Sequence, residues 1–194
     1  SLETATNWSK SKDMTISSKD VGSGKVQIGF NNTSGYALAT ANGTSYSRDY
    51  TFTGDVYGNV TAAVYLKDAV GNETTSFIKI YNLDNTAPTI TNMGGKSVAD
   101  EKVRFTVTAN DNKDFGGTVG VKAGSGVSSY AISSSNTAPA GGWQNSNEVD
   151  TTEDGIHYIF AKDAVGNVSS PYEVKVITLT INFNGGKYYD STSS

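Results

Sequence analysis

One six-residue segment that occurs twice limits the possible folds of this chain more than any other feature. Residues 67–72, Lys-Asp-Ala-Val-Gly-Asn, return unchanged as residues 162–167. The offset (162 − 67) is 95 residues, which is about the length of one β-sandwich module. An internal repeat at this spacing predicts two tandem copies of one structural unit.

Strand-like sequence flanks both copies of the hexapeptide. Residues 60–66 and 156–161 precede the two copies, and residues 76–80 and 172–176 follow them. These segments are rich in β-branched and aromatic residues, which favour pleated strands. We therefore expect each hexapeptide to connect two antiparallel strands as a hairpin loop.

The residue types of the hexapeptide suit such a loop. Asp68 and Asp163 can accept hydrogen bonds from backbone amides further along the turn. Gly71 and Gly166 can adopt a positive φ without steric cost, so we expect it at both. Side chains alternate along a strand, which predicts inward-facing positions before the loops at Ala62, Val64, Leu66, Ile159 and Ala161.

A second pair of matching segments lies upstream of the hexapeptides. A strand-like run ends at Asp20 before Gly-Ser-Gly at residues 22–24, and another ends at Asp111 before Gly-Ser-Gly at residues 124–126. The second copy carries an insertion, residues 112–123, between these two marks. The shared order of marks predicts that both halves have the same topology.

Together with the linker at residues 85–90, these marks resemble the bacterial immunoglobulin-like (Big-type) repeats of Gram-positive surface proteins. The resemblance implies two tandem modules at residues 1–85 and 86–177, the first truncated at its start. It also implies a role as stalk or spacer, with ligand binding in some members and no catalytic residues. Residues 179–188 resemble the small β-repeats of Listeria and Bacteroides surface proteins, so residues 178–194 are expected to begin a further module.

The composition agrees with an all-β fold, and the resemblance implies two tandem immunoglobulin-like antiparallel β-sandwiches. The net charge of −4 and the lack of a basic stripe argue against a nucleic-acid partner. No apolar run approaches the ~20 residues of a membrane span. The absence of cysteine from a chain rich in Gly, Asn, Ser and Thr favours a bacterial protein that is secreted or attached to the cell wall.

The sequence offers little chemistry. Its one histidine, His157, lies within a predicted strand, and no base and orienting group can be assigned to it. The acids of residues 148–154 form one run of the kind that is usually a solvated loop. Each hexapeptide offers one carboxylate and one amide, too few ligands for calcium. We therefore expect no enzyme activity, no metal site and no cofactor.

Four aromatic residues could stack on a sugar: Trp8, Trp143, Tyr188 and Tyr189. Trp143, in a glycine-rich loop, can either close one end of the sandwich or form a ligand platform. The leading function is a non-catalytic extracellular spacer. The alternative is an adhesin or carbohydrate-binding module that uses Trp143 and the insertion. Expected partners are other modules of the same parent chain and host or cell-wall glycans or proteins.

Overall fold

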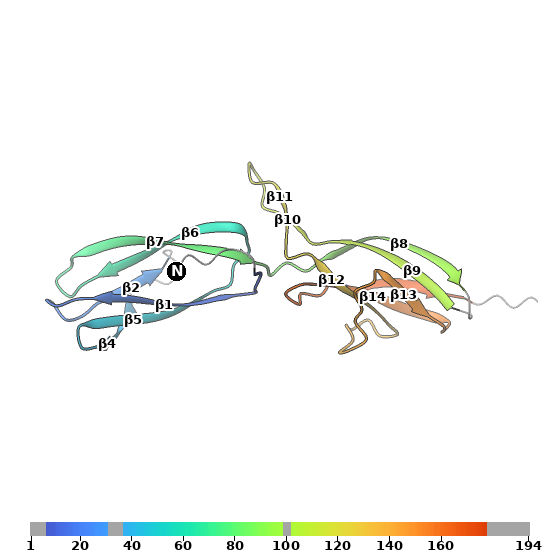
Figure 1. The fold of residues 1–194 in the computed structure, drawn as a ribbon, viewed down its shortest axis with the longest axis horizontal. Helices are drawn as coiled ribbons and strands as arrows, with labels where there is room; N and C mark the ends of the chain where they lie inside the picture. Colours follow the sequence, from blue (N-terminus) through green and yellow to red (C-terminus); the bar gives the residue numbers. More distant parts are fainter. Residues whose placement is uncertain (1–6, 31–36, 99–101, 178–194) are drawn as a thin grey trace, which may run out of the picture.

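The computed structural model describes residues 7–30, 37–98 and 102–177, and every regular element within these ranges is a β-strand. The strands form two antiparallel sandwiches that follow one another along the chain (Figure 1). This confirms the predicted fold class. No helix of the described ranges is long and apolar enough to cross a membrane. The expected further module at residues 178–194, including Tyr188 and Tyr189, lies outside the described residues.

The first sandwich pairs a four-stranded sheet, in the order β3-β2-β6-β7, with a three-stranded sheet, β1-β5-β4. Strands β6 and β7 pair along almost their whole length. The elements are β1 (Lys12–Lys19), β2 (Gln27–Phe30), β3 (Ala37–Leu38), β4 (Thr40–Asn42), β5 (Ser45–Phe52), β6 (Val56–Lys67) and β7 (Glu73–Leu83).

The second sandwich pairs the sheet β13-β9-β8 with the sheet β12-β14-β15. The predicted insertion forms a separate hairpin, β10-β11, which projects from the body of the module (Figure 1). The elements are β8 (Thr89–Val98), β9 (Lys102–Asn110), β10 (Asn112–Asp114), β11 (Val121–Ala123), β12 (Val127–Ser133), β13 (Glu148–Thr151), β14 (Gly155–Asp163) and β15 (Tyr172–Val176).

Each sandwich has its own hydrophobic core. One cluster of buried residues comes from β2, β5, β6 and β7, and the other from β9, β13, β14 and β15. The alternation predicted for the strands before the hexapeptides is present. Ala62, Val64, Ile159 and Ala161 are buried, and Leu66 is half-buried against the first core. The opposite face of β14 is also covered, because Phe160 is only 2% exposed.

The two hexapeptides form hairpin loops of the same conformation, as predicted. Gly71 and Gly166 have φ values of 96° and 88°. In both loops, the backbone amide of the aspartate donates to the backbone carbonyl of the asparagine, at 3.0 Å in the first loop and 3.1 Å in the second. The backbone amide of the glycine donates to the backbone carbonyl of the aspartate at 3.3 Å in each loop. The repeat in the sequence is therefore a repeat of backbone geometry.

The two loops lie at equivalent ends of their sandwiches but in different surroundings. The first joins the ends of β6 and β7 that lie furthest from the second sandwich (Figure 1). The second joins β14 to β15 and contacts the linker between the sandwiches through Asn167. Tandem repetition thus places the second loop, and not the first, at the junction.

Candidate functional site

Three segments of the chain meet at the junction, and each contributes one buried aspartate. Asp84 begins the linker, Asp111 follows β9, and Asp163 opens the second hexapeptide loop. Their exposed fractions are 0%, 4% and 2%. One carboxylate oxygen from each lies within 4.8 Å of the others. The fold therefore concentrates three acids in a space that excludes water.

Asp84 ties the two sandwiches together. Its Oδ1 accepts hydrogen bonds from the Tyr57 hydroxyl at 2.6 Å and from the Thr86 amide at 3.1 Å. Its Oδ2 accepts one from the Ser125 amide of the second sandwich at 2.7 Å. Because Tyr57 belongs to the first sandwich, this carboxylate links residues from both.

Asp111 is held on one side only. Its Oδ2 accepts hydrogen bonds from the Gly126 amide at 2.7 Å and from the Ser125 hydroxyl at 3.4 Å. Its Oδ1 is buried and has no hydrogen-bond partner among the described residues. Buried polar atoms are nearly always paired, so this oxygen lacks the partner that its surroundings require.

Asp163 organises the hexapeptide loop. Its Oδ1 accepts the amides of Val165 and Asn167 at 3.0 and 2.7 Å, and its Oδ2 accepts the Asn167 side-chain amide at 2.7 Å. The same Asn167 amide group donates to the carbonyl oxygens of Asp84 at 3.0 Å and Thr86 at 3.3 Å. The loop is therefore hydrogen-bonded to the linker.

The electrostatics of the three acids differ. Burial raises the pKa of Asp111; the Gly126 amide partly opposes this, and the nearby charges of Asp84 and Asp163 raise it further. Burial also acts to raise the pKa of Asp84, but hydrogen bonds from Tyr57 and Ser125 outweigh it, so its pKa lies below the usual value. Asp111 is therefore less suited than Asp84 to carry its charge in the absence of a cation.

Gly124 leaves the space that these carboxylates occupy. A Cβ atom at this position would lie 2.7 Å from Asp84 Oδ2, 2.8 Å from Asp111 Oδ2 and 3.0 Å from the Asp111 carbonyl oxygen. Any side chain here would displace the acids, so the Gly-Ser-Gly segment serves close packing at the junction.

The β10-β11 hairpin braces the junction from outside. Lys113 forms an ion pair with Asp55 of the first sandwich and donates to the Thr86 hydroxyl at 3.2 Å. The Phe115 ring packs edge-on against Tyr57, with centroids 5.2 Å apart. The Trp8 ring also packs edge-on against Tyr57, at the same centroid distance. The insertion thus contacts the neighbouring sandwich.

Trp143, the ligand candidate from the sequence, packs against its own module. It is half-buried, and its Nε1 donates to the Pro139 carbonyl at 3.0 Å. Lys162 Nζ lies 4.0 Å from the centroid of its ring, so a cation already occupies one ring face. The insertion contacts the first sandwich, whereas Trp143 contacts only residues of its own module in the interactions given above.

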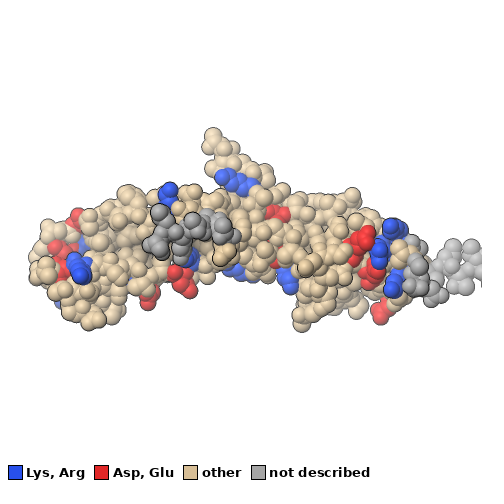
Figure 2. Space-filling view, in the orientation of Figure 1, with Lys and Arg blue, Asp and Glu red and all other residues tan. Residues whose placement is uncertain are grey.

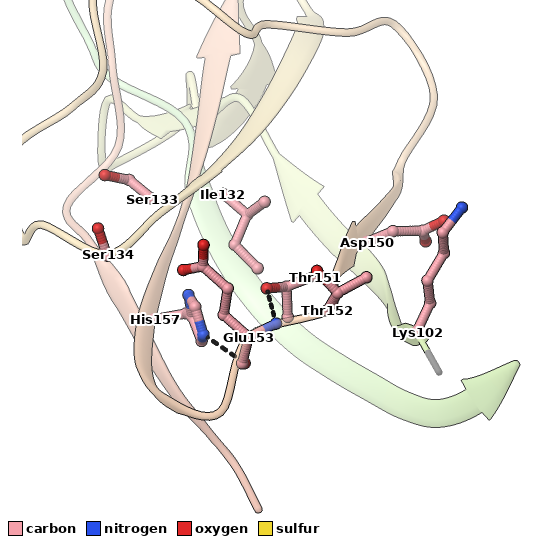
Figure 3. A pocket seen from close by; sticks show the side chains of 9 residues that line it. All are labelled: Lys102, Ile132, Ser133, Ser134, Asp150, Thr151, Thr152, Glu153 and His157. Atoms are coloured by element: carbon pink, nitrogen blue, oxygen red, sulfur yellow. Dashed lines mark hydrogen bonds between the residues drawn. The ribbon is translucent and has the colours of Figure 1, made fainter. Parts of the chain in front are cut away.

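His157 and two of the candidate acids, Asp150 and Glu153, line a cavity of about 310 Å³ in the second sandwich (Figure 3). His157 is buried, and its Nε2 donates to the Glu153 carbonyl at 2.9 Å. Arg104 holds Asp150 through two hydrogen bonds of 2.8 Å, which lower the pKa of Asp150, and it also pairs with Glu148. These contacts give His157, Asp150 and Glu148 structural roles.

On the face shown in Figure 2, positive and negative side chains occur in small separate groups with uncharged surface between them. The three junction acids contribute almost nothing to this surface, since all are buried. The junction was not predicted from the sequence. The sequence nevertheless contains signals of it: Asp84 at the head of the linker, and Asp111 and Asp163 in the two repeated marks.

No family model and no curated protein matches this chain. Among solved structures it is similar to the fibronectin(III)-like modules of Clostridium thermocellum CbhA, at 15% identity and a TM-score of 0.34, over 94% of each chain. It is also similar to SGBP-B of a Bacteroides ovatus mixed-linkage glucan utilization locus, solved with a mixed-linkage heptasaccharide. That match has 14% identity and a TM-score of 0.23, and covers 88% of this chain and 42% of the other. Neither likeness assigns a family or a function.

Proposed function

We propose that this chain is a non-catalytic spacer that holds two immunoglobulin-like modules in a fixed, extended arrangement. The proposal assigns residues 1–85 and 86–177 to bacterial immunoglobulin-like repeats of a secreted or cell-wall-attached protein, with a further module beginning at residue 178. The observation that carries it is the junction, where a buried carboxylate, Asp84, is hydrogen-bonded to both sandwiches.

The linker is fastened along its length. The Asn85 side-chain amide donates to the carbonyl oxygens of Lys10 at 2.9 Å and Thr53 at 2.8 Å, both before the linker. The next residue, Thr86, offers its carbonyl to Asn167, and Pro88 is buried. A hinge would expose its backbone to water, whereas this linker is hydrogen-bonded to residues on both sides. The arrangement favours a fixed angle between the modules.

Small-angle X-ray scattering tests the fixed arrangement. We expect the wild-type curve to fit a single elongated conformation. The double variant Lys113→Ala/Phe115→Ala lacks the brace formed by the β10-β11 hairpin. Its scattering curve should therefore fit only an ensemble of angles between the two modules. The matched control is Val119→Ala, because Val119 lies on the same hairpin and is 54% exposed. A wild-type curve that fits only two freely jointed modules would refute the spacer proposal.

The alternative, glycan binding through Trp143 and the insertion, has less support. The insertion contacts Tyr57 and Asp55 of the first sandwich, and Lys162 covers one face of the Trp143 ring. A glycan array with the whole chain separates the two functions. Binding that is lost in Trp143→Ala would favour the alternative, and binding to no glycan would favour the spacer.

A further inference from the structure

We propose that the three buried aspartates at the junction, Asp84, Asp111 and Asp163, bind a calcium ion. One carboxylate oxygen from each lies within 4.8 Å of the others, a spacing that one cation can bridge with small side-chain movements. This inference deepens the proposed spacer function, on which it rests, because it names what stabilises the junction.

The unpaired oxygen of Asp111 is the independent observation that points to a ligand. Only 4% of Asp111 is exposed, and its Oδ1 has no hydrogen-bond partner within the part of the chain that the structure describes. An unpaired carboxylate oxygen in such a place carries a large desolvation penalty. A cation bound to this oxygen would remove the penalty and explain why the acid is there.

The charge of the cluster leads to the same ligand. The hydrogen-bond donors that reach the three carboxylates within the described ranges are backbone amides, two hydroxyls and the Asn167 amide, all of them neutral. None of these donors carries a positive charge that could offset the three carboxylates. Buried charges in proteins are usually paired or coordinate a metal.

The donor set selects the type of ion. All three side chains offer oxygen, which hard cations such as Ca²⁺ and Mg²⁺ prefer, and no imidazole or thiolate of the kind that zinc prefers is among them. The three acids come from separate segments with irregular geometry. Calcium accepts irregular shells of six to eight oxygens, completed by carbonyls and water, whereas magnesium demands a near-ideal octahedron.

No metal site was predicted from the sequence, because each hexapeptide by itself contains too few ligands for calcium. The third acid, Asp84, comes from the linker, about 80 residues before Asp163, and reaches the site only when the modules are docked. The proposal therefore departs from that prediction. It also implies that bound calcium favours the docked arrangement, since Asp84 is fixed by Tyr57 of the first sandwich while the other two acids belong to the second.

The first sandwich supplies matched controls. Asp20 accepts the Ser23 hydroxyl at 2.8 Å and the Gly24 amide at 3.1 Å through one oxygen, as Asp111 does with Ser125 and Gly126. Asp68 accepts the same loop donors as Asp163. Both control acids are half-buried, and among the described residues the three-acid cluster occurs at the junction alone.

The experiment compares thermal unfolding of the whole chain in EGTA with unfolding in CaCl₂ at about 1 mM. We expect calcium to raise the melting temperature by at least about 5 °C, and calorimetric titration to give one ion per chain. Asp111→Asn and Asp163→Asn should lose the rise, while Asp20→Asn and Asp68→Asn should keep it. Magnesium at the same concentration should give a smaller rise.

Several outcomes would overturn the calcium site: no rise in the wild type, a rise that persists in Asp111→Asn, or a larger rise with magnesium. Circular dichroism in EGTA establishes that each variant is folded, so a lost response cannot be attributed to unfolding. If calcium has no effect but scattering in EGTA still fits one elongated conformation, the metal site fails and the spacer function stands. If the wild type is freely jointed even in calcium, the spacer and the three-acid site both fail, because Asp84 reaches the site only when the modules are docked.

Discussion

Asp163 and Asp68 accept the same hydrogen bonds within their loops, yet Asp163 is buried and Asp68 is half-buried. In each loop, Oδ1 accepts the amides two and four residues further on, and Oδ2 accepts the asparagine side chain. The difference arises outside the loops, because the linker covers the second one. Identical local sequence thus serves as a plain turn in one place and as a docking surface in the other.

Substitution of the loop asparagines measures the contribution of docking. Asn167→Ala removes the hydrogen bonds to the loop and also those to Asp84 and Thr86, whereas Asn72→Ala removes only the loop bonds of an exposed side chain. We expect Asn167→Ala to lower the free energy of unfolding by about 1 kcal/mol more than Asn72→Ala. Urea denaturation of both variants checks this, and equal losses would contradict docking through Asn167.

The Gly-Ser-Gly segments give a second matched pair. A methyl group at Gly124 would lie within 3.0 Å of two buried carboxylate oxygens and a backbone carbonyl, while one at Gly22 would meet only Asp20 Oδ1 at 3.6 Å. Overpacking of this kind typically costs about 1–3 kcal/mol. Gly124→Ala should therefore lower stability by that amount in thermal or urea unfolding, and Gly22→Ala should have little effect. A tolerated Gly124→Ala would show that the acids can move apart freely.

Much of the fold could be predicted from the sequence because its signals are local. The hexapeptide contains its own turn, with an aspartate that accepts loop amides and a glycine at positive φ. The alternation that buries Val64 and Ile159 follows from the period of two along a strand. Both features depend on residues that are close together in the chain.

The junction could not be predicted because its partners are distant in the chain. Tyr57 and Asp84 are 27 residues apart, and Asn167 reaches a carbonyl 83 residues earlier. The alternative function used the insertion as a ligand surface, but Phe115 packs on Tyr57 of the other sandwich. Nothing in the local sequence of β10-β11 indicates that contact. Whether a loop is exposed or docked depends on how two modules meet.

Substitution of the loop glycines by alanine should cause equal backbone strain in the two hexapeptide loops. Gly71 and Gly166 both have positive φ, and an added Cβ would meet no atom within 4 Å at either position. The cost of alanine therefore comes from the backbone alone, at roughly 1 kcal/mol in each case. Calorimetry of Gly71→Ala and Gly166→Ala should show similar losses. A much larger loss at Gly166 would mean that the substitution also disturbs docking.

The pH dependence of stability should reveal Asp111 in protein freed of divalent ions. Its pKa is raised in the folded state, chiefly by burial and also by the facing charges of Asp84 and Asp163. As the pH rises from about 4, the usual pKa of aspartate, the unfolded chain releases this proton before the folded chain does. Stability therefore falls between pH 4 and the raised pKa, and the loss is complete above it.

Asp111→Asn removes this titration while keeping the shape of the side chain. In chelator, the variant should gain stability relative to the wild type as the pH rises, by about 1 to 2 kcal/mol at neutral pH. Asp20→Asn should do the opposite, because the amide of Gly22 and the hydroxyl of Ser23 lower the pKa of Asp20, and its contribution is present at neutral pH and lost on acidification. Urea denaturation between about pH 2 and pH 8 measures both, because the contribution of Asp20 is lost only as the pH falls below about 4, the usual pKa of aspartate. Parallel curves for the wild type and Asp111→Asn would show that Asp111 carries its charge at the junction without penalty, and would remove the electrostatic reason for a cation there.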